Sequence, residues 1–426
     1  MKKILLFIAA LLLFLPILPV FADEPWEEDD GLRYIILKTT FDYTPLREAP
    51  STNAQRYTHL RKGVSVYAEE YDSNFYILDF GTSKRYWVEK KYVTPVSKVV
   101  EKRGTKISNI KIYDNKENYL VKIKTKTKMQ TPYKIAQTGN ELGFQMYNID
   151  LKKNKKRSRK NKETYGIKIN SSNIEGFNVF MMKPSVNSGV LALNYKSRVP
   201  IFGYDVKRKD NALILQIRKP IDIKSKKPLK GVKIALDAGH GGSEPGCVSR
   251  GIKEKDVNLQ ITKKLNKELK KRGAKTVLTR KKDIDVELYK RVEMAKDGNA
   301  DFLISIHQNS LANPENYEKK HGAGVYYYNQ NAKALAESVQ EHLVRATGFR
   351  DDGVFNSSLA LTRTTDPVSI LVECGYLIHP YERVKLTDED FQTTVAEGIA
   401  NGIEKHLRYL KNHQYKRLKY SRREAL

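Results

Sequence analysis

The chain has 426 residues, of which 40% are hydrophobic and 30% charged, a composition typical of folded protein and a length that suits about three domains. Its 77 Lys and Arg outnumber 49 Asp and Glu, and the net charge of +28 predicts a polyanionic partner: nucleic acid, an anionic membrane surface or a cell-wall polymer. Two cysteines, Cys247 and Cys374, exclude a disulfide-rich scaffold and leave open whether the two pair.

The N-terminus predicts export. A basic start precedes an apolar run from Ile4 to about Phe21, which is typical of a signal peptide over residues 1–22. An uncleaved membrane anchor is the alternative, but Pro16 and Pro19 interrupt the run near its end and favour cleavage after Ala22. We therefore expect secretion across the inner membrane to the periplasm or cell wall. Export argues against nucleic acid and favours peptidoglycan, with an anionic wall polymer or lipid surface as a further partner.

Residues 33–97 contain short runs of β-branched and aromatic residues divided by turn signals, which predicts a small β domain. The stretches Pro45–Pro50, Leu60–Gly63 and Trp87–Val93 resemble those of a bacterial SH3-like domain. The resemblance implies either a module that binds wall peptides or a small β-barrel without a ligand of its own, and the sequence leaves both open.

Residues 100–222 alternate between apolar and polar positions without a long helical period, which predicts a two-sheet β-sandwich. The position of this region resembles that of the wall-targeting AMIN domain of secreted amidases. Within it, Lys152–Lys162 holds eight Lys or Arg in eleven residues. This segment is either a solvated hairpin loop or an electrostatic clamp on an anionic wall polymer or phospholipid.

Residues 232–407 have a different pattern. A buried strand is predicted at Val232–Leu236, and apolar residues at every fourth position from Val257 to Leu269 predict a helix. Further strands and helices alternate after it, so we expect an α/β domain with a mostly parallel sheet. The basic tail at residues 408–426 is expected to be a frayed extension.

Three side chains with metal-binding chemistry lie where this α/β domain would form a crevice. His240 follows the first strand in a glycine-rich turn, Glu254 opens the next helix, and His307 ends another strand. Alone, each is more often structural. Together, two imidazoles and one carboxylate match the protein ligands of a catalytic zinc, with the fourth position left for water.

At these residues the sequence resembles the catalytic domain of the zinc-dependent N-acetylmuramoyl-L-alanine amidases, the Amidase_3 group. The matching stretches follow the family order and are highly specific: Leu236–Gly242 (LDAGHGG), Glu254–Leu259 (EKDVNL), Thr279-Arg280, Leu288 with Arg291, Ala300–Asn309 (ADFLISIHQN) and Val372–Leu377 (VECGYL).

The resemblance implies Zn²⁺ on His240, Glu254 and His307, with Glu373 as the catalytic acid/base. The reaction would hydrolyse the amide between the lactyl group of N-acetylmuramic acid and L-alanine in peptidoglycan. The chemistry is consistent: zinc lowers the pKa of water to about 7, and a carboxylate outside the metal shell can move the proton to the leaving amine.

Other residues near these motifs admit two readings. Asp237 could orient the metal-binding histidine that follows it or cap the turn. Arg280 and Arg291 are expected to be structural ion-pair partners rather than substrate binders. Strand alternation predicts that Cys374 is a core residue. His379 stands where the family often has an amide side chain, and we expect it at the rim of the site.

Two other functions use the same features. A zinc peptidase that cuts within the stem peptide would need the same three ligands, and a catalytically silent wall-binding activator would share the upstream domains. The silent protein is expected to lack a ligand or the acid/base residue, whereas all four residues are present here.

Overall fold

The computed structural model describes residues 34–80, 84–99, 104–126, 132–150, 169–171, 177–182, 189–197, 200–221, 223, 226–311 and 318–423. The predicted signal peptide at residues 1–22 and the basic run Lys152–Lys162 lie outside these described residues. Among the described helices, none is both long and apolar enough to cross a membrane.

The first region is a single antiparallel sheet of seven strands in the order β3-β2-β6-β5-β4-β1-β7. Leu37, Val66 and Leu78 form part of its core. The β-rich prediction for residues 33–97 agrees with this sheet, and the SH3-like resemblance stays a prediction. The strands are β1 (Tyr34–Thr39), β2 (Thr44–Arg47), β3 (Arg56–Leu60), β4 (Ser65–Glu70), β5 (Phe75–Asp79), β6 (Tyr86–Glu89) and β7 (Val93–Val99).

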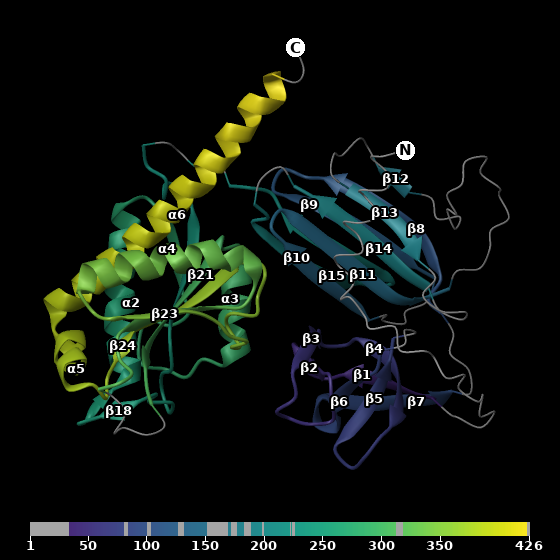
Figure 1. The fold of residues 1–426 in the computed structure, drawn as a ribbon, viewed down its shortest axis with the longest axis horizontal. Helices are drawn as coiled ribbons and strands as arrows, with labels where there is room; N and C mark the ends of the chain where they lie inside the picture. Colours follow the sequence, from purple (N-terminus) through teal and green to yellow (C-terminus); the bar gives the residue numbers. More distant parts are fainter. Residues whose placement is uncertain are drawn as a thin grey trace.

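The second region consists of two sheets, β10-β11-β14-β13 and β12-β8-β9-β16-β15. Side chains of both sheets, such as Phe144 and Leu215, share one buried core, so the region is a β-sandwich (Figure 1). The AMIN-like resemblance stays a prediction. The strands are β8 (Ile107–Asp114), β9 (Asn118–Thr125), β10 (Tyr133–Thr138), β11 (Glu141–Ile149), β12 (Ile169–Ser171), β13 (Phe177–Met182), β14 (Gly189–Lys196), β15 (Gly203–Lys209) and β16 (Ala212–Arg218).

The third region is an α/β domain around a six-stranded sheet in the order β20-β17-β21-β24-β22-β23. Its strands are β17 (Lys233–Ala238), β20 (Lys275–Leu278), β21 (Phe302–Asn309), β22 (Ala323–Tyr327), β23 (Asp351–Asn356) and β24 (Val368–Tyr376), with a small hairpin of β18 (Val248–Ser249) and β19 (Ile252–Lys253) beside them. The helices are α2 (Glu254–Lys271), α3 (Leu288–Asp297), α4 (Gln330–Thr347), α5 (Pro380–Thr387) and α6 (Glu389–Arg423).

This sheet is mixed, which refines the expectation of a mostly parallel one. Strands β20, β17, β21 and β24 run parallel, whereas β22 pairs antiparallel with β24. Apolar faces of α2, α4 and α6 share the large core with one side of the sheet. On the other side, Val292 and Ala295 of α3 pack on Ala235 and Leu303.

The expectation of a frayed tail from residue 408 was wrong, because α6 continues as helix to Arg423. The segment contains no Gly or Pro and is rich in Lys, Arg and Leu, which have high helix propensity. Helical propensity therefore carries the helix beyond the core contacts of Leu407 and Leu410. Figure 1 shows the end of α6 projecting away from the sheet.

The three regions meet at the amino end of the six-stranded sheet, where β21 and β24 begin. Arg218 at the end of β16 lies 2.9 Å from both Asp301 and Asp366 of the α/β domain, and all three side chains are nearly buried. Phe202 packs edge-to-face on Phe302 with ring centroids 5.3 Å apart. These buried contacts fix the β-sandwich against the α/β domain.

Candidate active site

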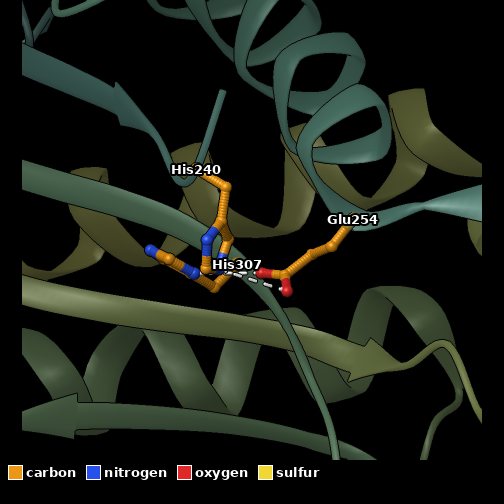
Figure 2. Close-up of side chains that lie close together, drawn as sticks. All are labelled: His240, Glu254 and His307. Atoms are coloured by element: carbon orange, nitrogen blue, oxygen red, sulfur yellow. Dashed lines mark hydrogen bonds and ion pairs between the residues drawn. The ribbon is translucent and has the colours of Figure 1, made fainter. Parts of the chain in front are cut away.

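His240, Glu254 and His307 converge at the carboxyl end of the six-stranded sheet, as Figure 2 shows. His240 lies just after β17, Glu254 begins α2, and His307 lies near the end of strand β21. Their ligand atoms all lie within 4.8 Å of one another. The structure therefore brings together all three predicted metal ligands, from positions 67 residues apart in the chain.

Glu254 is the centre of the cluster. Its Oε2 lies 3.3 Å from His240 Nε2, and its Oε1 lies 3.0 Å from His307 Nδ1. Burial disfavours the charged carboxylate, but the contacts with both imidazoles outweigh burial and hold the pKa of Glu254 well below its ordinary value. The carboxylate is therefore ionised at neutral pH, which is the state a cation requires.

Two glycines leave the space that these side chains occupy. A Cβ on Gly239 would lie 2.3 Å from the His307 ring, and a Cβ on Gly246 would lie 2.4 Å from Glu254 Oε2. Gly246 also has a φ of +67°, which L side chains rarely adopt. A side chain at either glycine would therefore displace His307 or Glu254.

Glu373 lies beside the cluster on the neighbouring strand, where its Cα is paired with that of His307. Its Oε2 is buried and has no hydrogen-bond partner within the described part of the chain. Burial raises the pKa of Glu373 to about 7; the positive charge of His307 opposes this shift and the negative charge of Glu254 adds to it. A carboxyl group with such a pKa can both accept and donate a proton near neutral pH.

The residues fit a divalent metal ion such as zinc. Two imidazole nitrogens and an ionised carboxylate are the donors that zinc prefers. The Glu254 carboxylate lies 3.3 Å from His240 Nε2 and 3.0 Å from His307 Nδ1, and the centroids of the two imidazole rings are 5.0 Å apart. Glu373, whose Oε2 has no partner among the described residues, is paired in register with His307 on the adjacent strand.

Comparison with known proteins bears on this domain alone. Residues 234–405 match the family described as N-acetylmuramoyl-L-alanine amidase, Amidase_3. The uncharacterized protein YqiI of Bacillus subtilis is 34% identical over 180 residues, which are 42% of this chain and 86% of that protein. The chain belongs to the N-acetylmuramoyl-L-alanine amidase family.

Other members of the amidase family are similar over the same domain. The N-acetylmuramoyl-L-alanine amidase LytC of Bacillus subtilis is 33% identical over 187 residues, 43% of this chain but 37% of LytC. The probable cell wall amidase LytH of Staphylococcus saprophyticus is 33% identical, over 42% of this chain and 59% of LytH. This chain thus covers less than two thirds of either protein.

Among solved structures, the catalytic domain of the amidase CwlV from Bacillus (Paenibacillus) polymyxa var. colistinus is 36% identical. The match covers 42% of this chain and 98% of that domain, with a TM-score of 0.39.

Other motif residues of the amidase domain, such as Asp237 and Arg291, stabilise the fold around the cluster. Asp237 is fully buried and accepts hydrogen bonds from Thr279, Ser305 and Arg291, so the idea that it orients His240 was wrong. The expectation for Arg291 as an ion-pair partner is confirmed by its 2.8 Å contact with Asp237. The physical reason is that the Asp237 carboxylate is already engaged by Arg291 of α3, Ser305 of the neighbouring strand β21 and Thr279 after β20.

Arg280 is structural, but through carbonyl groups instead of a carboxylate. Its guanidinium donates to Ala238 O, Gly239 O and Lys255 O at 2.6 to 3.0 Å. Arg291 in turn donates to His240 O at 2.9 Å. The two arginines hold the loop that carries His240, which has the strained φ of +58°.

Two polar residues of the site could not be identified from the motifs alone. Asn258 donates to Glu254 Oε1 at 3.1 Å and to Gly239 O at 3.2 Å. The backbone N–H of Gln308 donates to the same carboxylate oxygen at 3.1 Å. Asn258 follows Glu254 by four residues on α2, and this helical spacing is the signal that could have found it.

The remaining expectations concern the cysteines and His379. Cys374 is fully buried in the large core, as strand alternation predicted. Both cysteines are free thiols. His379 accepts a hydrogen bond from the backbone N–H of Glu382 at 3.3 Å, which caps α5, and stacks on His321 with centroids 4.6 Å apart. The residue at this position therefore organises the start of a helix.

Proposed function

We propose that the protein is a zinc-dependent N-acetylmuramoyl-L-alanine amidase that hydrolyses the amide between N-acetylmuramic acid and L-alanine in peptidoglycan. The observation that carries the proposal is the convergence of His240, Glu254 and His307 beside the unpartnered carboxyl oxygen of Glu373. Membership of the amidase family supports the choice of reaction.

His240, Glu254 and His307 would hold the ion. When bound, zinc supplies a Lewis acid that polarises the amide carbonyl and makes water a stronger nucleophile near neutral pH. The chain's own residues position it: Asn258 and the Gln308 amide orient Glu254, while Arg280 and Arg291 hold the loop of His240. Such supporting contacts fix ligand geometry.

Glu373 would carry the proton. Hydrolysis adds water across the amide and leaves a carboxylate on the lactyl group and a free amine on L-alanine. Glu373 takes the proton from the attacking water and passes it to the leaving nitrogen. Its position next to His307 on the adjacent strand and its raised pKa both suit this role.

We further propose that the protein acts outside the cytoplasmic membrane, in the periplasm or cell wall. The apolar N-terminal run supports export. The net charge of +28 supports this placement too, because a positively charged protein would be attracted to anionic wall or lipid surfaces.

Mass analysis of digested peptidoglycan tests the reaction. Purified muropeptides incubated with the zinc-loaded protein should yield peptides with a free L-alanine amino terminus and intact sugars with a free lactyl carboxylate. Fragments cut within the stem peptide would show a peptidase instead. Binding to the wall without any new product would show a silent wall-binding protein.

A further inference from the structure

A cavity of about 350 Å³ lies where all three regions meet. None of the residues of the metal cluster, by which we mean the side chains of His240, Glu254 and His307, lines this cavity. Its volume is within the range of small-molecule pockets, about 300 to 1,000 Å³. Its wall combines tyrosines with cations: Tyr43, Tyr57, His59 and Arg61 from the first region, Tyr133, Lys134, Tyr204 and Asp205 from the sandwich, and Tyr328, Asn329 and Arg363 from the amidase domain.

The aromatic wall is rigid. Tyr57 stacks on Tyr86 with centroids 4.1 Å apart, and Tyr43 stacks on Tyr289 of α3 at 6.0 Å. The ring of Tyr328 meets His59 edge-to-face at 5.9 Å. Lys134 and Arg61 lie over the rings of Tyr57 and Tyr43, at 4.1 and 5.0 Å from the ring centroids. These two rings therefore present their edges and hydroxyl groups to the cavity, and such polar rims can hydrogen-bond to sugar hydroxyl groups.

The charge of the wall is positive. Asp205 is the acidic residue among those lining the cavity, and its carboxylate is already paired with Lys296 at 2.7 Å and Arg61 at 3.5 Å. Lys134 lies over the Tyr57 ring at 4.1 Å, and within the described part of the chain neither it nor Arg363 forms an ion pair with a carboxylate. The cavity therefore has two cationic groups available to an anion.

His59 adds no charge of its own to the cavity wall. Burial first, and then the positive charges of Arg363, Arg56 and Arg47, lower the pKa of His59 to about 3, so the ring is neutral. Its Nε2 is buried and lacks a hydrogen-bond partner among the described residues.

The cavity is separate from the metal cluster. In the register of β22 and β24, Gly324 pairs with Glu373, whereas Tyr328 lies four residues further along the chain. At about 3.3 Å per residue, this places Tyr328 roughly 13 Å toward the amino end of the sheet. A ligand in the cavity would thus occupy a second site.

We propose that this cavity binds an acidic saccharide, namely wall glycan whose muramic acid carries a free lactyl carboxylate. The inference rests on the proposed function, because amide hydrolysis creates that carboxylate on each processed sugar. The tyrosine edges and hydroxyl groups would contact the sugar ring, and Lys134 and Arg363 would bind the carboxylate. The protein would then hold processed glycan at one site while the other acts on neighbouring, unprocessed glycan.

Calorimetric titration of the full-length chain tests this site, in the Glu373→Gln background so that no ligand is turned over. The probes are two disaccharides of N-acetylglucosamine and N-acetylmuramic acid, one with a free lactyl carboxylate and one with that group as a methylamide. We expect the carboxylate form to bind about tenfold tighter, the size of one charge-assisted hydrogen bond.

Lys134→Gln should weaken binding of the carboxylate form about tenfold and leave the methylamide unchanged. Lys111→Gln is the matched control, because Lys111 is an exposed lysine on β8 that does not line the cavity. Equal binding of the two disaccharides, or no effect of Lys134→Gln, would overturn the proposal. Displacement of the disaccharide by a glycerol-phosphate oligomer would also overturn it, in favour of a phosphate polymer.

The hydrolysis assay separates this inference from the proposed function. Lys134→Gln with Glu373 intact should cleave soluble muropeptides at the parent rate, since Lys134 lies outside the metal cluster. Normal hydrolysis by the parent chain, with no disaccharide binding in its Glu373→Gln form, would rule out the second site alone. Failure of the parent chain to produce L-alanine amino termini would sink the amidase reaction alone, because disaccharide binding is measured without turnover.

Discussion

The two ends of the six-stranded sheet hold their polar groups in different ways. At the carboxyl end, one domain supplies every part of the metal cluster and its supports, from Asp237 to Gln308. At the amino end, the charged contacts join separate regions: Arg218 of the sandwich meets Asp301 and Asp366, and Asp205 links Arg61 with Lys296.

The difference predicts different behaviour. The carboxyl end is assembled as soon as the amidase domain folds, because its hydrogen bonds are internal to that domain. The amino end, including the interdomain cavity, exists only while three regions stay packed together. Substitutions at one end should therefore leave the properties of the other end largely unchanged.

The largest effect is expected for Glu373→Gln at the carboxyl end. If Glu373 carries the proton as proposed, its replacement should lower the rate of muropeptide hydrolysis by about 10² to 10⁴-fold. Bound zinc, measured by metal analysis, should stay the same, since Glu373 is not one of the three residues that could hold a metal ion. The matched control is Glu244→Gln, whose exposed carboxylate lies 4.0 Å from His240 Nδ1 and should be dispensable. A Glu373→Gln variant as active as this control would refute the role of Glu373.

Arg218→Met tests how much the buried ion pairs at the amino end stabilise the protein. It leaves Asp301 and Asp366 buried without their cation, and loss of one partner of a buried ion pair costs about 3 to 5 kcal/mol. Urea denaturation should show this loss, whereas Arg345→Met, which removes an exposed pair with Glu341, should change stability by less than about 1 kcal/mol. Hydrolysis per folded molecule should stay near the parent value. A matching loss of zinc affinity would show that the two ends are coupled.

Gly246→Ala should weaken metal binding without removing any of the three metal-binding residues or Glu373. The new Cβ would lie 2.4 Å from Glu254 Oε2, so the ligand must move, and zinc affinity should fall about 10- to 100-fold. Gly251→Ala is the control: Gly251 has a similarly unfavourable φ of +82° but open space around it. Both variants lose some stability, and competition with a zinc chelator should show weakened binding for Gly246→Ala alone. Equal losses of zinc affinity in the two variants would mean that backbone strain, and not the contact with Glu254, causes the weaker binding.

The smallest effect concerns pH. Burial lowers the pKa of His406 from its ordinary value of 6.5 to about 4, beside Phe302 at the amino end of β21. Below pH 6.5 the unfolded chain therefore binds a proton that the folded chain does not, and stability falls as the pH falls toward 4. At pH 5.5 this loss is about 1.4 kcal/mol.

His406→Phe should remove that part of the pH dependence. Urea unfolding at pH 7.5 and 5.5, for the parent and the variant, measures the difference between the two losses. The loss on acidification should be smaller in the variant by about 1.4 kcal/mol. An unchanged loss would show that His406 does not contribute.

The sequence predicted the metal cluster because its residues lie in short motifs whose geometry is local. His240 follows a strand, Glu254 begins a helix and His307 ends a strand, so the carboxyl end of a parallel sheet brings them together. Asp237 was harder, because a buried aspartate next to a ligand can face either way, and its true partners, Thr279 and Arg291, are more than forty residues distant.

The amino end could not be predicted in the same way. Arg61, Lys134 and Arg363 belong to three regions, and nothing in the spacing of these residues indicates that they line one cavity. The extension of α6 to Arg423 was missed for another reason: a basic segment without apolar periodicity resembles a disordered tail, while helix propensity alone favours the helix.

The proposed hydrolysis depends most on a metal ion at the carboxyl end of the sheet. Crystals of the protein grown with zinc, measured above and below the zinc absorption edge, test this directly. We predict one anomalous peak between His240, Glu254 and His307, about 2.0 to 2.2 Å from a nitrogen of each imidazole and an oxygen of the carboxylate. A structure with zinc bound elsewhere, or with the three side chains unchanged and no peak between them, would contradict the account.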